Sequence, residues 1–297
     1  MSRWQANLML LIAGALWGAG FVAQSTAMQA ISPLQFIGFR FLAATLAMLP
    51  FALREAARAP TPLRPADAAM FAAIGLVMFA SMLAQQYGLL YTTVSNSGFL
   101  TGLYVVMVPI VGIALFREWP HFVVWPAVLV AFAGIWLLAG GNVSALTRGD
   151  WLTVFCAALA AVQLVMVGRY AVHSGRPVTL AVTQFAVCGL MGLGLAFALE
   201  TFDLEGLRKA APEILYAGVV SGGIAFTLQA VGQRYTTSSQ AAIFMASEAI
   251  FAALFGAWFL GERLPPTALL GCALIFAAIV AVEALPPLLR RRQTVKP

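Results

Sequence analysis

The chain has 297 residues, of which 62% are hydrophobic and only 9% are charged. A soluble domain carries charge on about a quarter of its residues, so this composition excludes an ordinary soluble protein. It predicts an integral membrane protein, and membrane topology accounts for the net charge of +6 without a nucleic-acid partner.

Ten apolar runs follow one another along the chain, each close to the roughly 20 residues that a helix needs to cross a bilayer. The alternating segments of a transmembrane barrel are absent from the sequence, so the runs are predicted to be helices. The first run is longer than the apolar part of a usual signal peptide and is retained as a helix. The predicted spans are residues 7–28, 34–53, 67–90, 96–116, 122–140, 150–171, 178–200, 212–233, 238–259 and 266–286.

Lys and Arg concentrate in cytoplasmic loops, so their positions orient the chain. If the N-terminus lies inside, the outer segments hold only four basic residues, whereas the inner segments hold most of the 17 and Arg40 lies within a span. We therefore predict that both termini are cytoplasmic. The inner residues are Arg3, Arg54, Arg58, Arg64, Arg117, Arg169, Arg176, Arg234, Arg290, Arg291, Arg292 and Lys296; the outer ones are Arg148, Arg208, Lys209 and Arg263.

A similar polar segment occurs twice, at Tyr91-Thr92-Thr93 and at Tyr235-Thr236-Thr237. The two segments are 144 residues apart, and the same offset pairs further residues without gaps: Gln85 with Gln229, Gly88 with Gly232, Ser95 with Ser239, Gly112 with Gly256 and Glu118 with Glu262. A constant offset is the signature of an internal repeat. We predict two five-helix halves, residues 1–143 and 145–287, followed by a basic cytoplasmic tail at 288–297.

Five is an odd number, so the second half must enter the membrane inverted relative to the first. The predicted fold is thus an all-α membrane protein of ten transmembrane helices in two inverted repeats. Inverted repeats are typical of transporters whose substrate site lies between the halves, near the middle of the bilayer.

The stretch YTTSSQAAIFMASEAIFAALFGAWFLGERLPPTALLGCALIFAAIV resembles the repeat of the drug/metabolite transporter superfamily, in its EamA-like branch. Gly261-Glu262-Arg263 and Gly271 match that pattern, and Arg40 stands where the family commonly has an arginine. One departure is Ala249, which follows Glu248 where proline is common, so the ninth helix is expected to be less kinked. The resemblance implies an inner-membrane exporter of metabolites or amino acids, aromatic amino acids among them.

Glu248 lies eleven residues into the ninth predicted helix, close to the bilayer centre. A carboxylate at that depth costs about 2.5–3.5 kcal/mol on insertion scales, so ionisable residues there are candidates for function. We predict that Glu248 binds a substrate ammonium group or carries a proton. The structural alternative is a protonated side chain bonded to a neighbouring helix.

Other candidates share a helix face or a repeat position with Glu248, or are polar groups that need partners in hydrocarbon. Arg40 is expected to tie helices together, with carboxylate recognition or gating as its alternative. Packing against neighbouring helices is the structural alternative for the aromatic and amide side chains. The substrate-binding candidates are Trp17, Met82, Tyr87, Thr101, Tyr104, Gln163, Met245 and Glu248; the gating or structural polar candidates are Gln24, Arg40, Gln85, Gln184 and Gln229.

The predicted function is a secondary transporter that exports small amphipathic metabolites, most of all amino acids with aromatic or hydrophobic side chains, by alternating access. An exporter of cationic drugs or polyamines is the alternative, and a membrane scaffold or lipid-pathway enzyme is the alternative from another class. The sequence contains no nucleotide-binding loop, Ser/His/Asp arrangement or metal-ligand cluster, so no enzyme activity, cofactor or metal is expected. The expected partners are a small-molecule substrate and the lipid bilayer, and a monomer is compatible with the sequence.

Overall fold

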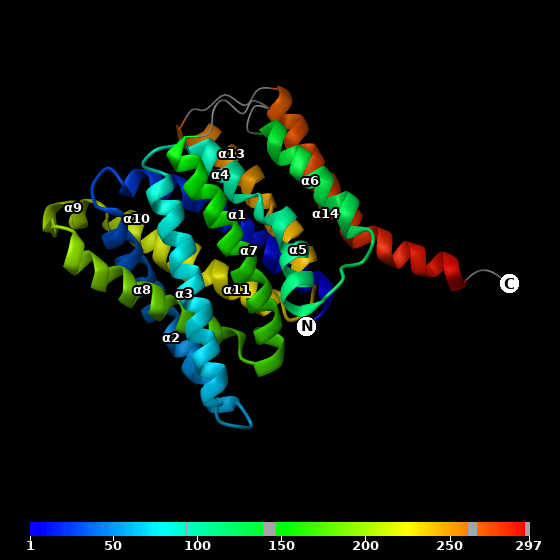
Figure 1. Ribbon diagram of the computed structural model, residues 1–297, viewed down its shortest axis with the longest axis horizontal. Coiled ribbons are helices and arrows are strands. Elements are labelled where there is room, and N and C mark those ends of the chain that lie inside the picture. Colours follow the sequence, from blue (N-terminus) through cyan, green and yellow to red (C-terminus); the bar gives the residue numbers. More distant parts are fainter. Residues whose placement is uncertain (93, 139–146, 261–265, 295–297) are drawn as a thin grey trace.

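The computed structural model describes residues 1–92, 94–138, 147–260 and 266–294 (Figure 1), and every regular element within these ranges is a helix. The elements are α1 (Arg3–Ala27), α2 (Pro33–Arg58), α3 (Pro65–Gly88), α4 (Val94–Thr101), α5 (Tyr104–Phe116), α6 (Val124–Leu138), α7 (Arg148–Ser174), α8 (Pro177–Leu199), α9 (Leu204–Lys209), α10 (Ala211–Leu215), the π-helix η1 (Tyr216–Ile224), α11 (Ala225–Gly232), α12 (Ser238–Met245), α13 (Ser247–Leu260) and α14 (Pro266–Thr294).

Each predicted span coincides with one helix or with consecutive helical segments, so the all-helical class is confirmed. Seven helical stretches are long and apolar enough to cross a membrane. Three shorter apolar helices, Tyr104–Phe116, Val124–Leu137 and Pro266–Val282, account for the other predicted spans. A multi-pass membrane protein follows, whereas ten crossings with both termini inside stay a prediction.

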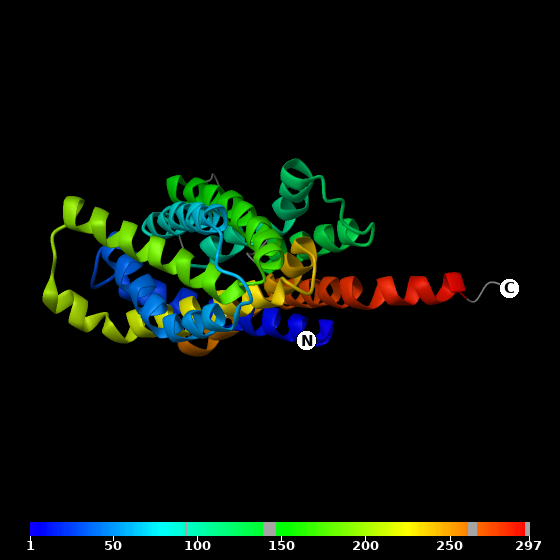
Figure 2. The ribbon, with the colours of Figure 1, turned by 90° about the horizontal axis from the view of Figure 1, so that it is seen from below.

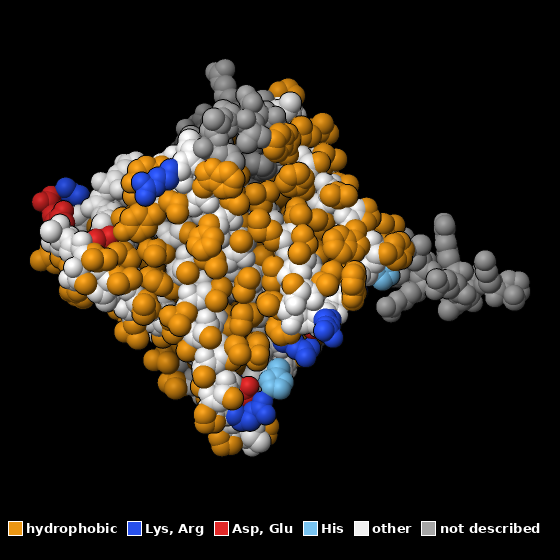
Figure 3. Space-filling view, viewed as in Figure 1, with side chains coloured by type: hydrophobic (Ala, Val, Ile, Leu, Met, Phe, Trp, Pro, Cys, Tyr) orange, Lys and Arg blue, Asp and Glu red, His pale blue; other side chains and the backbone are white. Residues whose placement is uncertain are grey.

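Hydrophobic side chains cover most of the face seen in Figure 3, and the charged side chains lie toward its edges. Large apolar side chains such as Leu129, Leu190 and Phe197 are 65%, 68% and 71% exposed. A soluble monomer rarely exposes so large a continuous apolar surface. Lipid is the environment in which such a surface is stable.

The fourth and ninth predicted spans are interrupted at equivalent positions. The first is divided into α4 and α5 around Gly102, and the second into α12 and α13 at Ala246, 144 residues later. At each break the backbone carbonyl accepts a hydrogen bond from the amide of the residue three positions later. Val105 N lies 3.1 Å from Gly102 O, and Ala249 N lies 3.2 Å from Ala246 O. The interruption of the ninth span thus comes from this tighter hydrogen-bonded turn without a proline at 249. The expectation of a less kinked ninth helix stays a prediction.

The second helices of the two halves, α2 and α8, run side by side (Figures 1 and 2). Their backbones are in close contact, because a Cβ atom added to Gly192 would lie 2.7 Å from the Gly38 nitrogen. Glycine is required at this crossing, since any side chain would force the helices apart.

Each of these two helices also caps the N-terminus of the other. Near the end of α2, the Glu55 carboxylate accepts from Val178 N at 3.1 Å and from Thr179 N at 2.7 Å. At the end of α8, Glu200 accepts from Leu34 N and Gln35 N, both at 3.2 Å. The four amide donors are related by the 144-residue offset. The same interaction, a glutamate capping the N-terminus of the facing helix, therefore joins the halves at both ends of the helix pair.

We expect Gly192→Ala to destabilise the protein by about 1–3 kcal/mol, because its methyl group overpacks the α2–α8 contact. Gly194→Ala is the matched control, since a Cβ there would meet nothing within 4 Å. It should leave stability unchanged or raise it by about 0.5–1 kcal/mol, the usual gain of replacing a helical glycine by alanine. Thermal unfolding in detergent measures both variants, and equal melting temperatures would contradict the prediction.

Candidate functional site

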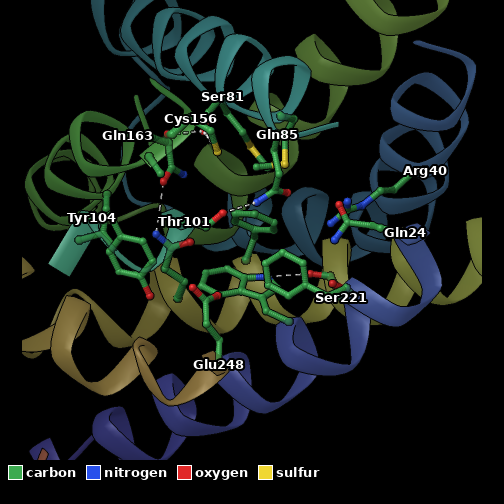
Figure 4. Close-up of a pocket in the computed structure, with 18 residues that line it drawn as sticks. Gln24, Arg40, Ser81, Gln85, Thr101, Tyr104, Cys156, Gln163, Ser221 and Glu248 are labelled. Carbon is green, nitrogen blue, oxygen red and sulfur yellow. Dashed lines mark hydrogen bonds between the residues drawn. The ribbon is translucent and has the colours of Figure 1, made fainter. Parts of the chain in front are cut away.

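A cavity of about 70 Å³ lies in the middle of the helical bundle, between its two largest hydrophobic clusters (Figure 4). One buried water occupies roughly 10–15 Å³ on this measure, so several waters or a small metabolite fit. Both halves of the chain contribute to its wall. The lining residues are Trp17, Phe21, Gln24, Arg40, Met78, Ser81, Met82, Gln85, Thr101 and Tyr104 from the first half, and Cys156, Ala160, Gln163, Leu164, Ser221, Phe226, Gln229 and Glu248 from the second.

Glu248 and Tyr104 lie at the interrupted helices, in the first turns of α13 and α5. Both side chains are 4% exposed, and Figure 4 shows their oxygen atoms pointing toward one another. Neither Glu248 Oε1 nor Tyr104 Oη has a hydrogen-bond partner in the structure. The cavity therefore contains a carboxylate and a hydroxyl with free hydrogen-bonding capacity.

Two glycines of α1 bring this helix against the start of α13. A Cβ atom at Gly14 would lie 3.2 Å from Glu248 N, and one at Gly18 would lie 2.8 Å from Glu248 O. The intervening Trp17 is thereby held in the cavity wall. Its indole Nε1 donates to Ser221 O of the π-helix η1 at 3.0 Å.

Arg40 is the cation of the cavity and is 3% exposed. Its Nε donates to Ala217 O at 3.0 Å, again in η1, and its guanidinium carbon lies 5.0 Å from the centre of the Phe41 ring. No carboxylate within the described ranges forms an ion pair with it. Single π-helical turns often occur at functional sites, and here η1 supplies the carbonyl groups that hold both Arg40 and Trp17.

Amide side chains form a hydrogen-bonded chain along another wall. Gln163 Nε2 donates to Gln184 Oε1 at 2.8 Å, and Gln229 Nε2 donates to Gln163 Oε1 at 3.5 Å. On α3, Gln85 Nε2 donates to Thr101 Oγ1 at 3.2 Å. These bonds link neighbouring helices within each half and satisfy polar groups that hydrocarbon would leave unpaired.

The cavity wall between these polar groups is apolar. The rings of the lining residues Trp17 and Phe226 have centroids 4.7 Å apart. Met78 and Met82 complete this part of the lining. A ligand in the cavity would meet aromatic and thioether surface in the middle and polar groups around it.

Most of the predicted site residues meet in this cavity: Trp17, Gln24, Arg40, Met82, Gln85, Thr101, Tyr104, Gln163, Gln229 and Glu248 line it. Three do not. Met245 is fully buried at the end of α12, and half-buried Tyr87 packs against the cluster around α2 and α8. Gln184 is hydrogen-bonded to the lining residue Gln163. The predicted roles of all these residues in binding or gating stay predictions.

Several lining residues were not predicted from the sequence. Phe226 had a detectable signal, since it is the repeat equivalent of Met82 at the 144-residue offset. Phe21 belongs to the same helical stripe as Trp17 and Gln24. The others, Met78, Ser81, Cys156, Ala160, Leu164 and Ser221, are small or apolar residues that sequence spacing does not separate from core positions.

A multi-pass helical membrane protein with a central cavity built from two halves has the architecture of a membrane transporter. The model of the EamA-like transporter family matches residues 4–140 and 148–283. The chain belongs to this family, and with it to the drug/metabolite transporter superfamily.

Two curated relatives are similar along almost their whole length. An uncharacterized transporter of Archaeoglobus fulgidus is 31% identical over 284 residues, which covers 95% of this chain and 87% of the relative. The uncharacterized transporter YwfM of Bacillus subtilis is 26% identical, with 94% of both chains covered. A solved crystal structure of a protein with 16% identity superposes with a TM-score of 0.79, covering 97% of this chain and 99% of the other, and supports the fold alone.

We expect Gln163→Leu to destabilise the protein by about 1–3 kcal/mol, because it leaves the amides of Gln184 and Gln229 without their buried partner. Gln86→Leu is the matched control: Gln86 is 1% exposed and its Nε2 has no hydrogen-bond partner. That substitution should be neutral or stabilising. Melting temperatures in detergent distinguish the two, and an equal loss in both variants would contradict the role assigned to Gln163.

Proposed function

We propose that the protein is a secondary transporter that exports small amphipathic metabolites, with amino acids of aromatic or hydrophobic character as the first choice. The observation that carries this proposal is the central cavity, whose lining combines apolar surface with buried polar atoms that have no partner. Such atoms are costly in an empty apolar environment, and a polar ligand would compensate them. The unpartnered lining atoms are Gln24 Oε1, Tyr104 Oη, Ser221 Oγ, Gln229 Oε1 and Glu248 Oε1.

The proposed binding roles follow from the chemistry of each group. Glu248 would accept from a substrate ammonium or Arg40 would donate to a substrate carboxylate, because neither has a counter-charge in the described part of the protein. Trp17, Met82 and Tyr104 would pack against an apolar or aromatic side chain.

Alternating access is proposed to use the two interrupted helices. Discontinuous helices near the bilayer midplane are a recurrent feature of secondary transporters. The breaks at Gly102 and Ala246 lie beside Tyr104 and Glu248, so a change in helix angle there would move groups of the cavity itself. Support comes from the equivalent positions of the breaks in the two repeats.

The proposed topology has ten crossings of the inner membrane, with both termini in the cytoplasm. Residues 1–143 and 145–287 would form two inverted halves, and 288–297 a cytoplasmic tail. The two consecutive matches to the family model and the distribution of Lys and Arg support this arrangement.

The topology predicts that α9 faces the outside and the end of α2 faces the cytoplasm. Exposed Glu205 and Arg58 are suitable positions for single cysteines in a chain whose three native cysteines are replaced. An impermeant maleimide should label Glu205→Cys in intact cells and Arg58→Cys only after permeabilisation. The reverse pattern would indicate the opposite orientation, and labelling of both positions in intact cells would contradict the predicted number of crossings between them.

Cationic drugs or polyamines are the second candidate substrates, because Glu248 offers a buried carboxylate oxygen without a partner. A scaffold or lipid-pathway enzyme is the candidate from another class. Counterflow in liposomes containing only this protein, with a panel of amino acids, nucleosides and organic cations, distinguishes these functions. Uptake of cations alone would favour the second candidate, and no uptake by folded protein would favour the other class.

Within amino-acid transport, we expect Trp17→Ala/Tyr104→Ala to lower phenylalanine counterflow at least tenfold, because it removes aromatic surface from the cavity wall. A loss of this size corresponds to about 1.4 kcal/mol of binding free energy. Trp258→Ala/Tyr235→Ala is the matched control: these residues are 80% and 40% exposed and do not line the cavity. Unchanged phenylalanine flux in the first variant would show that the aromatic preference is wrong.

A further inference from the structure

The two charged side chains of the cavity lie apart, and this separation restricts the substrate further. We infer that the preferred substrate carries its cationic and anionic groups at opposite ends of a short apolar chain, as an ω-amino carboxylate or a basic amino acid does. This inference rests on the proposed transport of amphipathic metabolites. It differs from a preference for ordinary α-amino acids, whose two charges are adjacent.

Helix α1 allows the separation to be estimated. Glu248 lies against Gly14 and Gly18, so its backbone is level with the middle of α1. The π-helix and α11 run antiparallel to α1, since Gly232 lies against Ala6 while Ser221 lies against Gly20.

Arg40 binds η1 at a position further toward the C-terminus of α1 than the Glu248 contact. It donates to Ala217 O, four residues before Ser221 and hence level with Gln24 of α1. Gln24 is six to ten residues beyond Gly14 and Gly18, so the levels along α1 at which the Glu248 backbone and the Arg40 Nε are held differ by about 9–15 Å at 1.5 Å per residue. We take this spacing as the approximate separation of the two charges. Figure 4 shows Arg40 beside Gln24 at one end of the group of lining residues, with Glu248 and Tyr104 away from that end.

Each end has its own polar groups. Tyr104 Oη lies beside Glu248, and Gln24 Oε1 and Ser221 Oγ lie toward the Arg40 end, all without partners. The Trp17 side chain extends from the level of Glu248 toward the π-helix, where its Nε1 donates to Ser221 O, and its ring packs against Phe226. The cavity therefore has an anionic end, an apolar middle and a cationic end.

A ligand whose charges are adjacent can pair with only one end and leaves the other buried charge uncompensated, which is unfavourable in a low-dielectric interior. A ligand with separated charges pairs with both. One charge-assisted hydrogen bond of about 2.8 Å at each end leaves roughly 3–9 Å for the ligand. At about 1.2 Å per bond of an extended chain, this corresponds to roughly three to eight bonds between the nitrogen and the carboxyl carbon.

The test compares two isomers, 5-aminopentanoate and 2-aminopentanoate, which contain the same atoms but place the nitrogen five bonds or two bonds from the carboxyl carbon. In counterflow with liposomes containing the full chain, we expect uptake of 5-aminopentanoate at least tenfold above that of 2-aminopentanoate. Pentanoate and pentylamine, which each retain one charge, should also be taken up at least tenfold more slowly than 5-aminopentanoate.

Three variants assign the ends. Arg40→Gln should abolish the preference for 5-aminopentanoate over pentylamine, and Glu248→Gln should abolish the preference over pentanoate, while Arg40→Lys should retain part of the first preference. Glu205→Gln and Arg208→Gln are charge-matched controls on exposed α9 and should retain the wild-type order. Because the isomer comparison uses the unaltered chain, it does not depend on the folding of any variant.

Equal uptake of the isomers, or faster uptake of 2-aminopentanoate, would overturn the inference while supporting amino-acid transport. The inference would also be overturned if neither isomer moved but phenylalanine did, and the proposed function would then stand. Absence of uptake for every solute of the panel, with folded protein, would overturn both.

Discussion

The hydrocarbon interior of the bilayer is the constraint on which this structure depends, because it offers no hydrogen bonds to polar groups. Amides such as Gln163, Gln184 and Gln229 meet this constraint by bonding to one another across helices. Arg40 and Glu248 meet it differently, since both line the cavity and neither forms an ion pair with a described residue. Polar atoms without hydrogen-bond partners are thus concentrated in the central cavity. A polar solute that binds there would compensate their desolvation and lower the free energy of the protein–solute complex.

The repeat supplies both the rigid and the interrupted parts of the framework. Glu55 and Glu200 cap the opposite helix at the two ends of the α2–α8 pair, so this pair is joined at both of its termini. Gly102 and Ala246, again related by the repeat, interrupt the helices that carry Tyr104 and Glu248. The same duplication therefore yields a firmly packed helix pair and two equivalent breaks at the cavity wall.

Much of the fold could be predicted from the sequence, because an apolar run of membrane length is nearly always a helix in lipid. Most of the site could be predicted as well, since buried polar residues such as Arg40 and Gln229 have few places to point except the interior. Met245 and Glu248 were expected on one helix face, but that expectation assumed an unbroken helix. The turn at Ala246 separates them, and Met245 packs in the core instead.

The sequence by itself determined the membrane environment, the all-helical class and the 144-residue repeat, because composition, hydrophobic length and internal similarity are properties of the chain. It also identified Arg40 and Glu248 as candidate functional residues, because a charged side chain in the hydrocarbon interior is energetically costly. Only the tertiary structure decided that these two charges line one cavity, together with the packed rings of Trp17 and Phe226. Distances between residues on different helices depend on how closely the helices pack, and spacing along the chain does not encode them.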